Sequence, residues 1–206
     1  MPRLITLTTD FGPGSLYVAQ MKARLLHAKA GCTLIDIAHD LPAHNIQAAS
    51  WFLGQACLAF PADTLHLVVI DPGVGTARKM VWARIGSQEF LAPDNGLLTH
   101  AAAVATLAEA RVLPEPADAS ATFHGRDVVA AAAVRLLDGE PASAFGEPWG
   151  PLVQLPEAAA SARPDGIHGA VRFIDHFGNL LTNIPAEEWP AVVAAGGLHL
   201  GDRWID

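Results

Sequence analysis

A carboxylate and an arginine stand on either side of a glycine-rich turn that follows an apolar segment, and this spacing could do chemistry. Residues 65–70 have the character of a buried strand, Asp71 follows directly, and Arg78 comes shortly after. The turn contains a proline, which fixes one backbone dihedral, and two glycines, which reach angles closed to other residues. Because open α/β sheets bind ligands at the carboxyl ends of their strands, Asp71 and Arg78 could share a reaction site. The structural alternative is an aspartate that caps its own turn beside a surface arginine.

Two further side chains could take part in the same chemistry. Asp10 follows the first predicted strand, where a carboxylate can accept hydrogen bonds from the vicinal hydroxyls of a ribose. His124 stands where a loop passes into a helix, and histidine exchanges protons near neutral pH. The structural alternative for Asp10 is a residue of an N-terminal turn. For His124 it is a residue at the start of a helix, where Asp127 would interact favourably with the helix dipole. Because these groups lie in loops that follow strands, one crevice could collect them.

Other catalytic and cofactor-binding motifs do not occur in the sequence. The glycine turn carries Arg78 where the dinucleotide-binding fingerprint needs a third glycine. There is no phosphate-binding loop of the Walker type and no G-x-S-x-G nucleophile elbow. His39, Asp40 and His44 match no zinc-binding spacing. The sequence therefore predicts no metal site.

The elements that must position these side chains alternate between strands and helices. Strands are predicted over residues 4–8, 33–37 and 65–70. Ser15 is expected to cap a helix that runs to about residue 30, and Asn45 a helix that runs to about residue 60. This β-α-β-α-β order predicts a parallel sheet with helices on both faces.

The second half of the chain is predicted to complete this domain and begin another. We expect, in order, paired strands over residues 79–85 and 89–92, a short helix over 97–104, a strand over 111–113, and an alanine-rich helix that ends near residue 139. The proline-rich residues 140–165 read as an interdomain linker. The predicted domains are therefore an N-terminal α/β domain over residues 1–139 and a β domain that begins at residue 166 and extends to 206.

Composition excludes several classes of partner. The 206 residues include 13 basic and 21 acidic side chains, giving a net charge of −8, and the basic ones form no run, which argues against nucleic acid. No apolar run approaches the ~20 residues of a membrane-spanning helix, and the start of the chain lacks a signal-peptide pattern. Cys32 and Cys57 are isolated, as in proteins of a reducing compartment. The sequence predicts a cytoplasmic protein that binds a small molecule, with no membrane or nucleic-acid partner.

Five motifs occur in the order in which one enzyme family carries them. They are Thr8-Thr9-Asp10-Phe11-Gly12, Ile70-Asp71-Pro72-Gly73-Val74-Gly75 with Arg78, Pro93-Asp94-Asn95-Gly96, Phe123-His124-Gly125-Arg126-Asp127 and Asp175-His176-Phe177-Gly178-Asn179. Over residues 4–184 the chain resembles the S-adenosyl-L-methionine (SAM) hydroxide adenosyltransferases, or SAM hydrolases, which are relatives of the fluorinase and chlorinase enzymes. The resemblance implies hydrolysis of SAM to adenosine and L-methionine by attack of water or hydroxide on the ribose C5′, without a cofactor.

The resemblance also implies a fold and an assembly. It implies a Rossmann-like N-terminal α/β domain with a mostly parallel sheet, followed by a smaller C-terminal β-barrel-like domain. It further implies a homotrimer with active sites between neighbouring subunits. The C-terminal domain of the family continues for several strands past the last motif, so we expect the second domain to be incomplete in these 206 residues.

The same resemblance assigns roles to residues. The catalytic set falls on Asp71, Arg78 and His124. From the chemistry of these side chains we expect Arg78 to stabilise the developing hydroxide, Asp71 to orient Arg78 or the water, and His124 to take or relay the proton. Asp10 would bind the ribose. The substrate-binding positions implied are Asp10, Phe11, His44, Phe123, Gly125, Asp175, Phe177 and Asn179.

Three features favour water over halide as the nucleophile. The halogenases carry a tyrosine where Asp71 stands and a serine where Gly125 stands. They also carry a long insertion before the turn at Pro93, where this chain has only a short hairpin. The alternatives that remain open are a SAM-dependent halogenase and a non-catalytic module that binds adenosine or SAM.

Overall fold

The computed structural model describes residues 3–156, 160–164, 166–194, 197–200 and 203–205 and divides into two compact units. Unit 1 spans Met1–Leu155 and unit 2 spans Pro156–Asp206. Residues 140–155, which the sequence assigns to the linker, belong to unit 1, and Phe145 and Leu152 are buried there. Trp149 adds a hydrogen bond from its indole Nε1 to the Asp94 carboxylate (2.7 Å). None of the described helices is long and apolar enough to cross a membrane.

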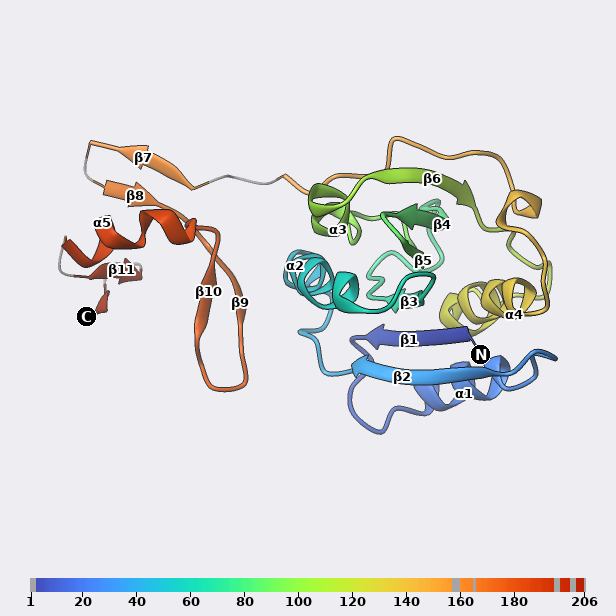
Figure 1. Ribbon diagram of the computed structural model, residues 1–206. Coiled ribbons are helices and arrows are strands. Elements are labelled where there is room, and N and C mark those ends of the chain that lie inside the picture. The colour runs from blue at the N-terminus through green and yellow to red at the C-terminus, as the bar shows by residue number, and fades with distance from the viewer. Residues whose placement is uncertain (1–2, 157–159, 165, 195–196, 201–202, 206) are drawn as a thin grey trace. The chain divides into compact units, whose positions relative to one another are not determined.

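Unit 1 is built on one six-stranded sheet with the order β2-β1-β3-β5-β4-β6 (Figure 1). Its strands are β1 (Arg3–Thr9), β2 (Cys32–Ala38), β3 (Leu65–Val69), β4 (Met80–Ile85), β5 (Gln88–Pro93) and β6 (Leu107–Val112). β4 alone runs antiparallel to both of its neighbours, and β2, β1, β3 and β5 pair in parallel. The mixed α/β fold with a mostly parallel sheet, predicted from the alternation of elements, is confirmed.

The first two helices begin at the predicted caps. Ser15 accepts a hydrogen bond from the Tyr17 N–H ahead of α1 (Leu16–Leu25), and the Asn45 side chain accepts one from Ala48 ahead of α2 (Ile46–Ala56). α1 ends at Leu25, well before residue 30, and the chain continues in i→i−3 turns at His27 and Ala28. The Lys29 N–H then donates to the Asp138 carboxylate (2.7 Å). A 3₁₀ turn, η1 (Cys57–Ala59), follows α2.

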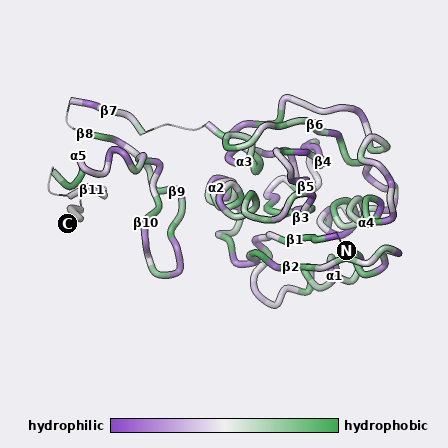
Figure 2. The backbone as a smooth tube through the Cα atoms, in the orientation of Figure 1, coloured by the Kyte–Doolittle hydropathy of each residue, from purple (hydrophilic) through white to green (hydrophobic). Residues whose placement is uncertain are grey.

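The remaining helices of unit 1 are short, and one of them is irregular. α3 (Thr99–Val104) packs against α2. The alanine-rich helix starts as a π-helical segment, η2 (Gly125–Ala130), and continues as α4 (Ala131–Leu137), which is mostly hydrophobic in Figure 2. A 3₁₀ turn, η3 (Ala142–Ala144), comes after α4. π-helical turns are frequent at functional sites, and this one directly follows His124.

Successive strand residues point to opposite faces of the sheet, and both faces are packed. On one face Ile5 and Leu7 pack with Met21 of α1 and with the η2–α4 helix. On the other face Thr6 donates to or accepts from His66 Nδ1 (2.7 Å), and the His66 ring stacks on Phe90. Both faces of the sheet are therefore packed against other parts of unit 1.

Unit 2 contains three two-stranded antiparallel ladders and one short helix. The pairs are β7 (Ser161–Arg163) with β8 (Gly166–His168), β9 (Val171–Ile174) with β10 (Leu180–Thr182), and β11 (Leu198–Leu200) with β12 (Arg203–Ile205). A 3₁₀ turn, η4 (Ala186–Glu188), leads into α5 (Trp189–Ala194). The described residues of unit 2 show these ladders as separate sheets, so the barrel-like arrangement remains a prediction.

Candidate active site

The buried strand β3 delivers Asp71 to the carboxyl edge of the sheet. Every residue of β3 is buried, and the chain turns sharply after it. Asp71 Oδ1 accepts a hydrogen bond from the Gly73 N–H (3.2 Å), which closes the turn. Gly75 has φ +78°, and a Cβ added there would lie 3.0 Å from the Ala121 carbonyl oxygen. The turn therefore needs glycine in order to pack against the segment that leads to His124.

Asp71, Arg78 and His124 form one hydrogen-bonded cluster. Arg78 Nε lies 3.1 and 2.9 Å from the two carboxylate oxygens of Asp71, and Arg78 Nη2 lies 2.5 Å from Oδ2. Nη2 also lies 2.9 Å from Nδ1 of His124. The side chains of Asp71 and Arg78 are only 6% and 9% exposed, so the pair is held in a region of weak solvent screening. The catalytic set implied by the resemblance is thus assembled from two segments, the loop between β3 and β4 and the start of η2.

The cluster fixes the tautomer of His124. A guanidinium is protonated throughout the neutral pH range and can only donate, so Nδ1 of His124 must accept from Arg78. The neutral ring then carries its proton on Nε2. His124 is 3% exposed, and among the described residues Nε2 has no hydrogen-bond partner. The ring is therefore oriented from the Arg78 side.

Asp10 and His44 form a second polar group. The His44 N–H donates to Asp10 Oδ2 (2.8 Å), and His44 adopts a positive φ of 63°, a strained angle for a residue with a side chain. Thr9 supports the same loop, since its hydroxyl lies 2.9 Å from His39 Nδ1 and accepts from the Phe11 N–H (3.3 Å). Asp10 also lines the cavity described below.

Three aromatic rings line a further side of the site. Phe11, Tyr17 and Phe123 meet edge to face, with ring centroids 5.0–6.3 Å apart. The guanidinium of Arg126 lies 4.9 Å from the centroid of the Phe123 ring and donates to the Asp127 carboxylate. The hydrogen bonds from Arg126 lower the pKa of the Asp127 carboxyl from its ordinary value. Asp127 is thus part of the support of the aromatic wall.

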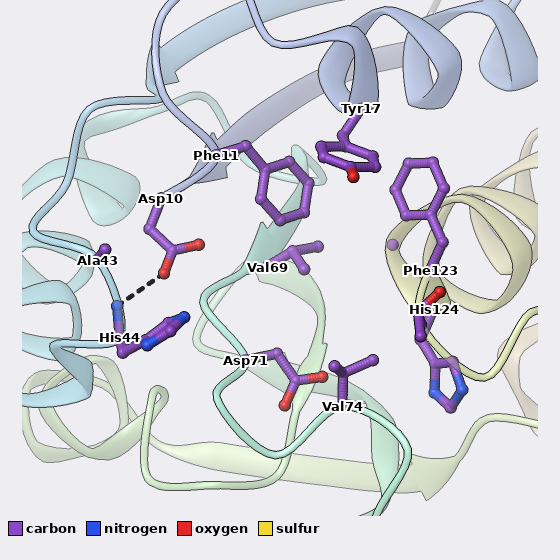
Figure 3. Close-up of a pocket in the computed structure, with 12 residues that line it drawn as sticks. Asp10, Phe11, Tyr17, Ala43, His44, Val69, Asp71, Val74, Phe123 and His124 are labelled. Carbon is purple, nitrogen blue, oxygen red and sulfur yellow. Dashed lines mark hydrogen bonds between the residues drawn. The ribbon is translucent and has the colours of Figure 1, made fainter.

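These groups surround a cavity of about 280 Å³. Its lining residues are Asp10, Phe11, Tyr17, Ala43, His44, Val69, Asp71, Val74, Thr122, Phe123, His124 and Gly125. Figure 3 shows the aromatic rings on one side, Asp10 with His44 on another, and Asp71 with Val74 opposite the rings. Arg78 does not line the cavity and reaches it through Asp71 and His124.

The structure brings together most of the residues singled out from the sequence. Among the positions expected to bind substrate, the cavity is lined by Asp10, Phe11, His44, Phe123 and Gly125. The sequence reasoning missed Tyr17, Val69, Val74, Thr122 and Ala43. Tyr17 offered a signal, because it is the single tyrosine of the chain and stands in the first turn of a predicted helix.

The other three expected positions belong to unit 2. Asp175, Phe177 and Asn179 form a tight turn between β9 and β10. Asp175 Oδ1 accepts from the backbone N–H groups of Phe177 (2.9 Å) and Asn179 (2.8 Å), and Oδ2 accepts from Asn179 Nδ2 (2.7 Å). The pKa of the Asp175 carboxyl lies below its ordinary value, mainly because of the hydrogen bond from the Asn179 side chain. Phe177 is 87% exposed at this turn.

Within the parts of the chain that the structure describes, no three His, Cys, Asp or Glu side chains gather closely enough to hold a metal ion. His39 is instead engaged with Thr9 and, at 3.2 Å, with Asp36. The polar groups of the cavity are therefore arranged as hydrogen-bonding groups and ion pairs.

Comparison with known sequences identifies the family. The family model described as the SAM hydroxide adenosyltransferase N-terminal domain matches residues 5–146. The chain belongs to the SAM hydroxide adenosyltransferase family. The resemblance that the five motifs indicated is confirmed.

Several named proteins are similar to this chain. The (R)-S-adenosyl-L-methionine hydrolase of Salinispora tropica is 38% identical over 185 residues, which cover 85% of this chain and 70% of that protein. The hydrolase of the same name from Thermus thermophilus is 36% identical over 214 residues, covering 98% and 82%. A fluorinase of Actinoplanes is more distant, with 27% identity over 212 residues that cover 88% and 71%.

A solved structure has the same fold as this SAM hydroxide adenosyltransferase family member. An uncharacterized conserved protein from Thermotoga maritima superposes with a TM-score of 0.83 at 36% identity, covering 91% of this chain and 74% of that one.

Proposed function

We propose that this chain hydrolyses SAM to adenosine and L-methionine by attack of water on the ribose C5′. The observation that carries the proposal is the Asp71–Arg78–His124 cluster at a cavity, in a chain 36–39% identical to four proteins named (R)-S-adenosyl-L-methionine hydrolase. No cofactor is needed for this reaction, because the substrate already carries its leaving group.

The difficult part of this reaction is the activation of the nucleophile. SAM is a sulfonium cation, so its leaving group departs as a neutral thioether and needs no acid. Bulk water has a pKa of about 15.7 and is a poor nucleophile. A site that orients one water and accepts its proton as the bond to carbon forms would lower the barrier.

Asp71 and His124 are placed to handle that water, because both line the cavity. Asp71 would orient the water and face the sulfonium charge. His124 would take the proton on Nδ1, where the hydrogen bond from Arg78 gives way as the proton arrives. Arg78 would keep both groups in register through its fork to Asp71 and favour negative charge developing on the water oxygen.

The opposite sides of the cavity suit the nucleoside. Asp10 would accept hydrogen bonds from the ribose hydroxyls through the oxygen that His44 leaves available. The rings of Phe11, Tyr17 and Phe123 offer apolar surface and π faces, which favour a flat base or a sulfonium cation. Asp175, Phe177 and Asn179 would contact the adenine and methionine moieties. In this proposal the protein is a cytoplasmic homotrimer whose sites lie between neighbouring subunits.

The test is a product assay. Purified protein incubated with SAM is expected to release adenosine and methionine in equal amounts, separated by chromatography, and the rate should not depend on added fluoride or chloride. Recovery of intact SAM bound to the protein would instead indicate a binding module. Formation of 5′-halo-adenosine would indicate a halogenase, and either result would overturn the proposal.

A further inference from the structure

The buried Nε2 atom of His124 carries a proton and makes no hydrogen bond within the part of the chain that the structure describes. Because Arg78 donates to Nδ1, the proton of the neutral ring sits on Nε2, and that atom is inaccessible to solvent. A buried donor without a partner costs about 1–3 kcal/mol, so such groups nearly always have an explanation.

The nearest carboxylate to that atom is Glu115. Its Oε1 lies 3.5 Å from Nε2 of His124, slightly beyond hydrogen-bond length. Glu115 stands between two prolines, Pro114 and Pro116, in the segment between β6 and η2. Proline restricts the backbone on both sides. The side chain of Glu115 is 60% exposed, so it has room to close the remaining gap by rotating about its own bonds.

The geometry points to Glu115 as a positioning residue of the reaction. Its carboxylate accepts a hydrogen bond from the Nε2–H group of His124, which keeps the lone pair of the ring on Nδ1. The same carboxylate stabilises the imidazolium that forms. This inference rests on the proposed hydrolysis and adds a residue that the five motifs do not contain.

The proton balance of the reaction shows why a carboxylate is needed there. The water oxygen bonds to C5′, the C5′–S bond breaks, and its electron pair leaves on the methionine sulfur. One water proton stays on the new 5′-hydroxyl and the other moves to Nδ1 of His124, which becomes an imidazolium. After the products leave, Nδ1 returns that proton to solvent and accepts again from Arg78.

The charges around His124 determine how costly the imidazolium is. Arg78 faces the ring from the loop after β3 and is paired with Asp71, so this pair contributes no net charge. Glu115 faces the ring from the other side. Without Glu115 the imidazolium would add an unpaired positive charge to a buried site next to a guanidinium, which is unfavourable. With Glu115 the four charges balance.

Turnover of Glu115→Gln tests the inference. The amide oxygen of glutamine can still accept a hydrogen bond from the Nε2–H group, but the side chain carries no charge. We expect kcat to fall about 10-fold with KM for SAM unchanged, a smaller loss than the ~10²–10⁴-fold of a group that transfers the proton itself.

Asp118→Asn is the matched control, since it removes one carboxylate from the same exposed segment. The control should keep the wild-type kcat and KM. If Glu115→Gln did the same, or if both variants changed alike, the assignment of Glu115 would be wrong. Melting temperatures of the variants should match that of the wild type, because both side chains are exposed.

A measurement without turnover separates this inference from the proposed function. Nitrogen NMR of the His124 ring should show the Nε2–H tautomer in the wild type, and the Nε2–H proton signal should move upfield in Glu115→Gln, because a neutral amide is a weaker acceptor than a carboxylate. An unchanged proton signal would overturn the inference even in an active enzyme. Failure of the product assay alongside a moved signal would instead overturn the hydrolysis and keep the contact between Glu115 and His124.

Discussion

At the scale of single residues, the site depends on one guanidinium that contacts three acceptor atoms of two residues. Arg78 contacts both oxygens of Asp71 and Nδ1 of His124, and it stands outside the cavity that those two residues line. Its role is therefore tied to the geometry of its planar fork as well as to its charge, and a point charge in the same place cannot reproduce it.

Arg78→Lys is expected to lower kcat by roughly 10²-fold while leaving the protein folded. Lysine keeps the positive charge beside Asp71 but cannot bond Asp71 in a fork and His124 together, and misplacement of about 1 Å costs a factor of this size. Steady-state kinetics give the rate, and circular dichroism checks the fold. A variant with wild-type kcat would show that the fork is not needed.

Gly125→Ala tests the tight packing at the start of the π-helical segment. A Cβ at residue 125 would lie 3.2 Å from Sδ of Met21 and 3.5 Å from the Phe123 ring. We expect a loss of about 1–3 kcal/mol in the free energy of unfolding, typical of overpacking, with a raised KM for SAM. In a double-mutant cycle with Met21→Ala, the double variant should be less destabilised than the sum of the single variants. Additive losses would mean that Met21 is not the obstacle.

At the scale of elements, the sheet buries a histidine that affects stability. His66 of β3 has no exposed surface, its Nδ1 is hydrogen-bonded to Thr6, and its ring lies between Phe60 and Phe90. Burial disfavours the charged ring and lowers the pKa of His66 to about 4, from an ordinary value of 6.5. The neutral ring is thus part of the apolar layer between β3 and its neighbours.

The free energy of unfolding should therefore fall as the pH is lowered from 6.5 toward 4. In this window the unfolded chain takes up a proton on residue 66 that the folded chain excludes, so the unfolded state gains at lower pH, by up to ~3 kcal/mol. Urea unfolding across pH 4–7 measures the loss. His66→Phe, which keeps an aromatic ring between Phe60 and Phe90, should show a flatter profile, and equal slopes for the two proteins would contradict the assignment.

At the scale of the whole molecule, the boundary of unit 1 is set by contacts made far along the chain. The Asp94 carboxylate, 9% exposed, accepts from the indole of Trp149 (2.7 Å) and from the backbone of Val153 (2.8 Å). Phe145 and Leu152 are buried in the same stretch. Residues 140–155 thus belong energetically to the α/β unit.

A fragment of residues 1–155 should be more stable than a fragment of residues 1–139. The shorter piece loses the burial of Phe145 and Leu152, each worth about 1.5–3 kcal/mol, and leaves the Asp94 carboxylate without two of its donors. Denaturant midpoints of the two fragments, at equal concentration, make the comparison. Equal midpoints would place the boundary at residue 139, as the composition alone suggests.

Much of unit 1 could be predicted because its signals are local. Ser15 and Asn45 cap helices at the expected positions, and the alternation of strands and helices gave the mostly parallel sheet. The partner of the segment after α1 could not be predicted, because the acceptor for the Lys29 N–H is Asp138, more than a hundred residues away. Likewise proline content suggested a linker where Phe145 and Trp149 pack.

The sequence by itself determined the chemical groups of this protein and, through five motifs in order, its family. Backbone turns at Gly75 and helix caps are set by nearby residues, so their patterns are readable. Only the tertiary structure decided that Arg78 lies behind Asp71 and His124, that Tyr17 joins the cavity, and that Glu115 faces Nε2. Distances between side chains from different segments depend on how the sheet ends and the helices pack, and no spacing along the chain encodes them.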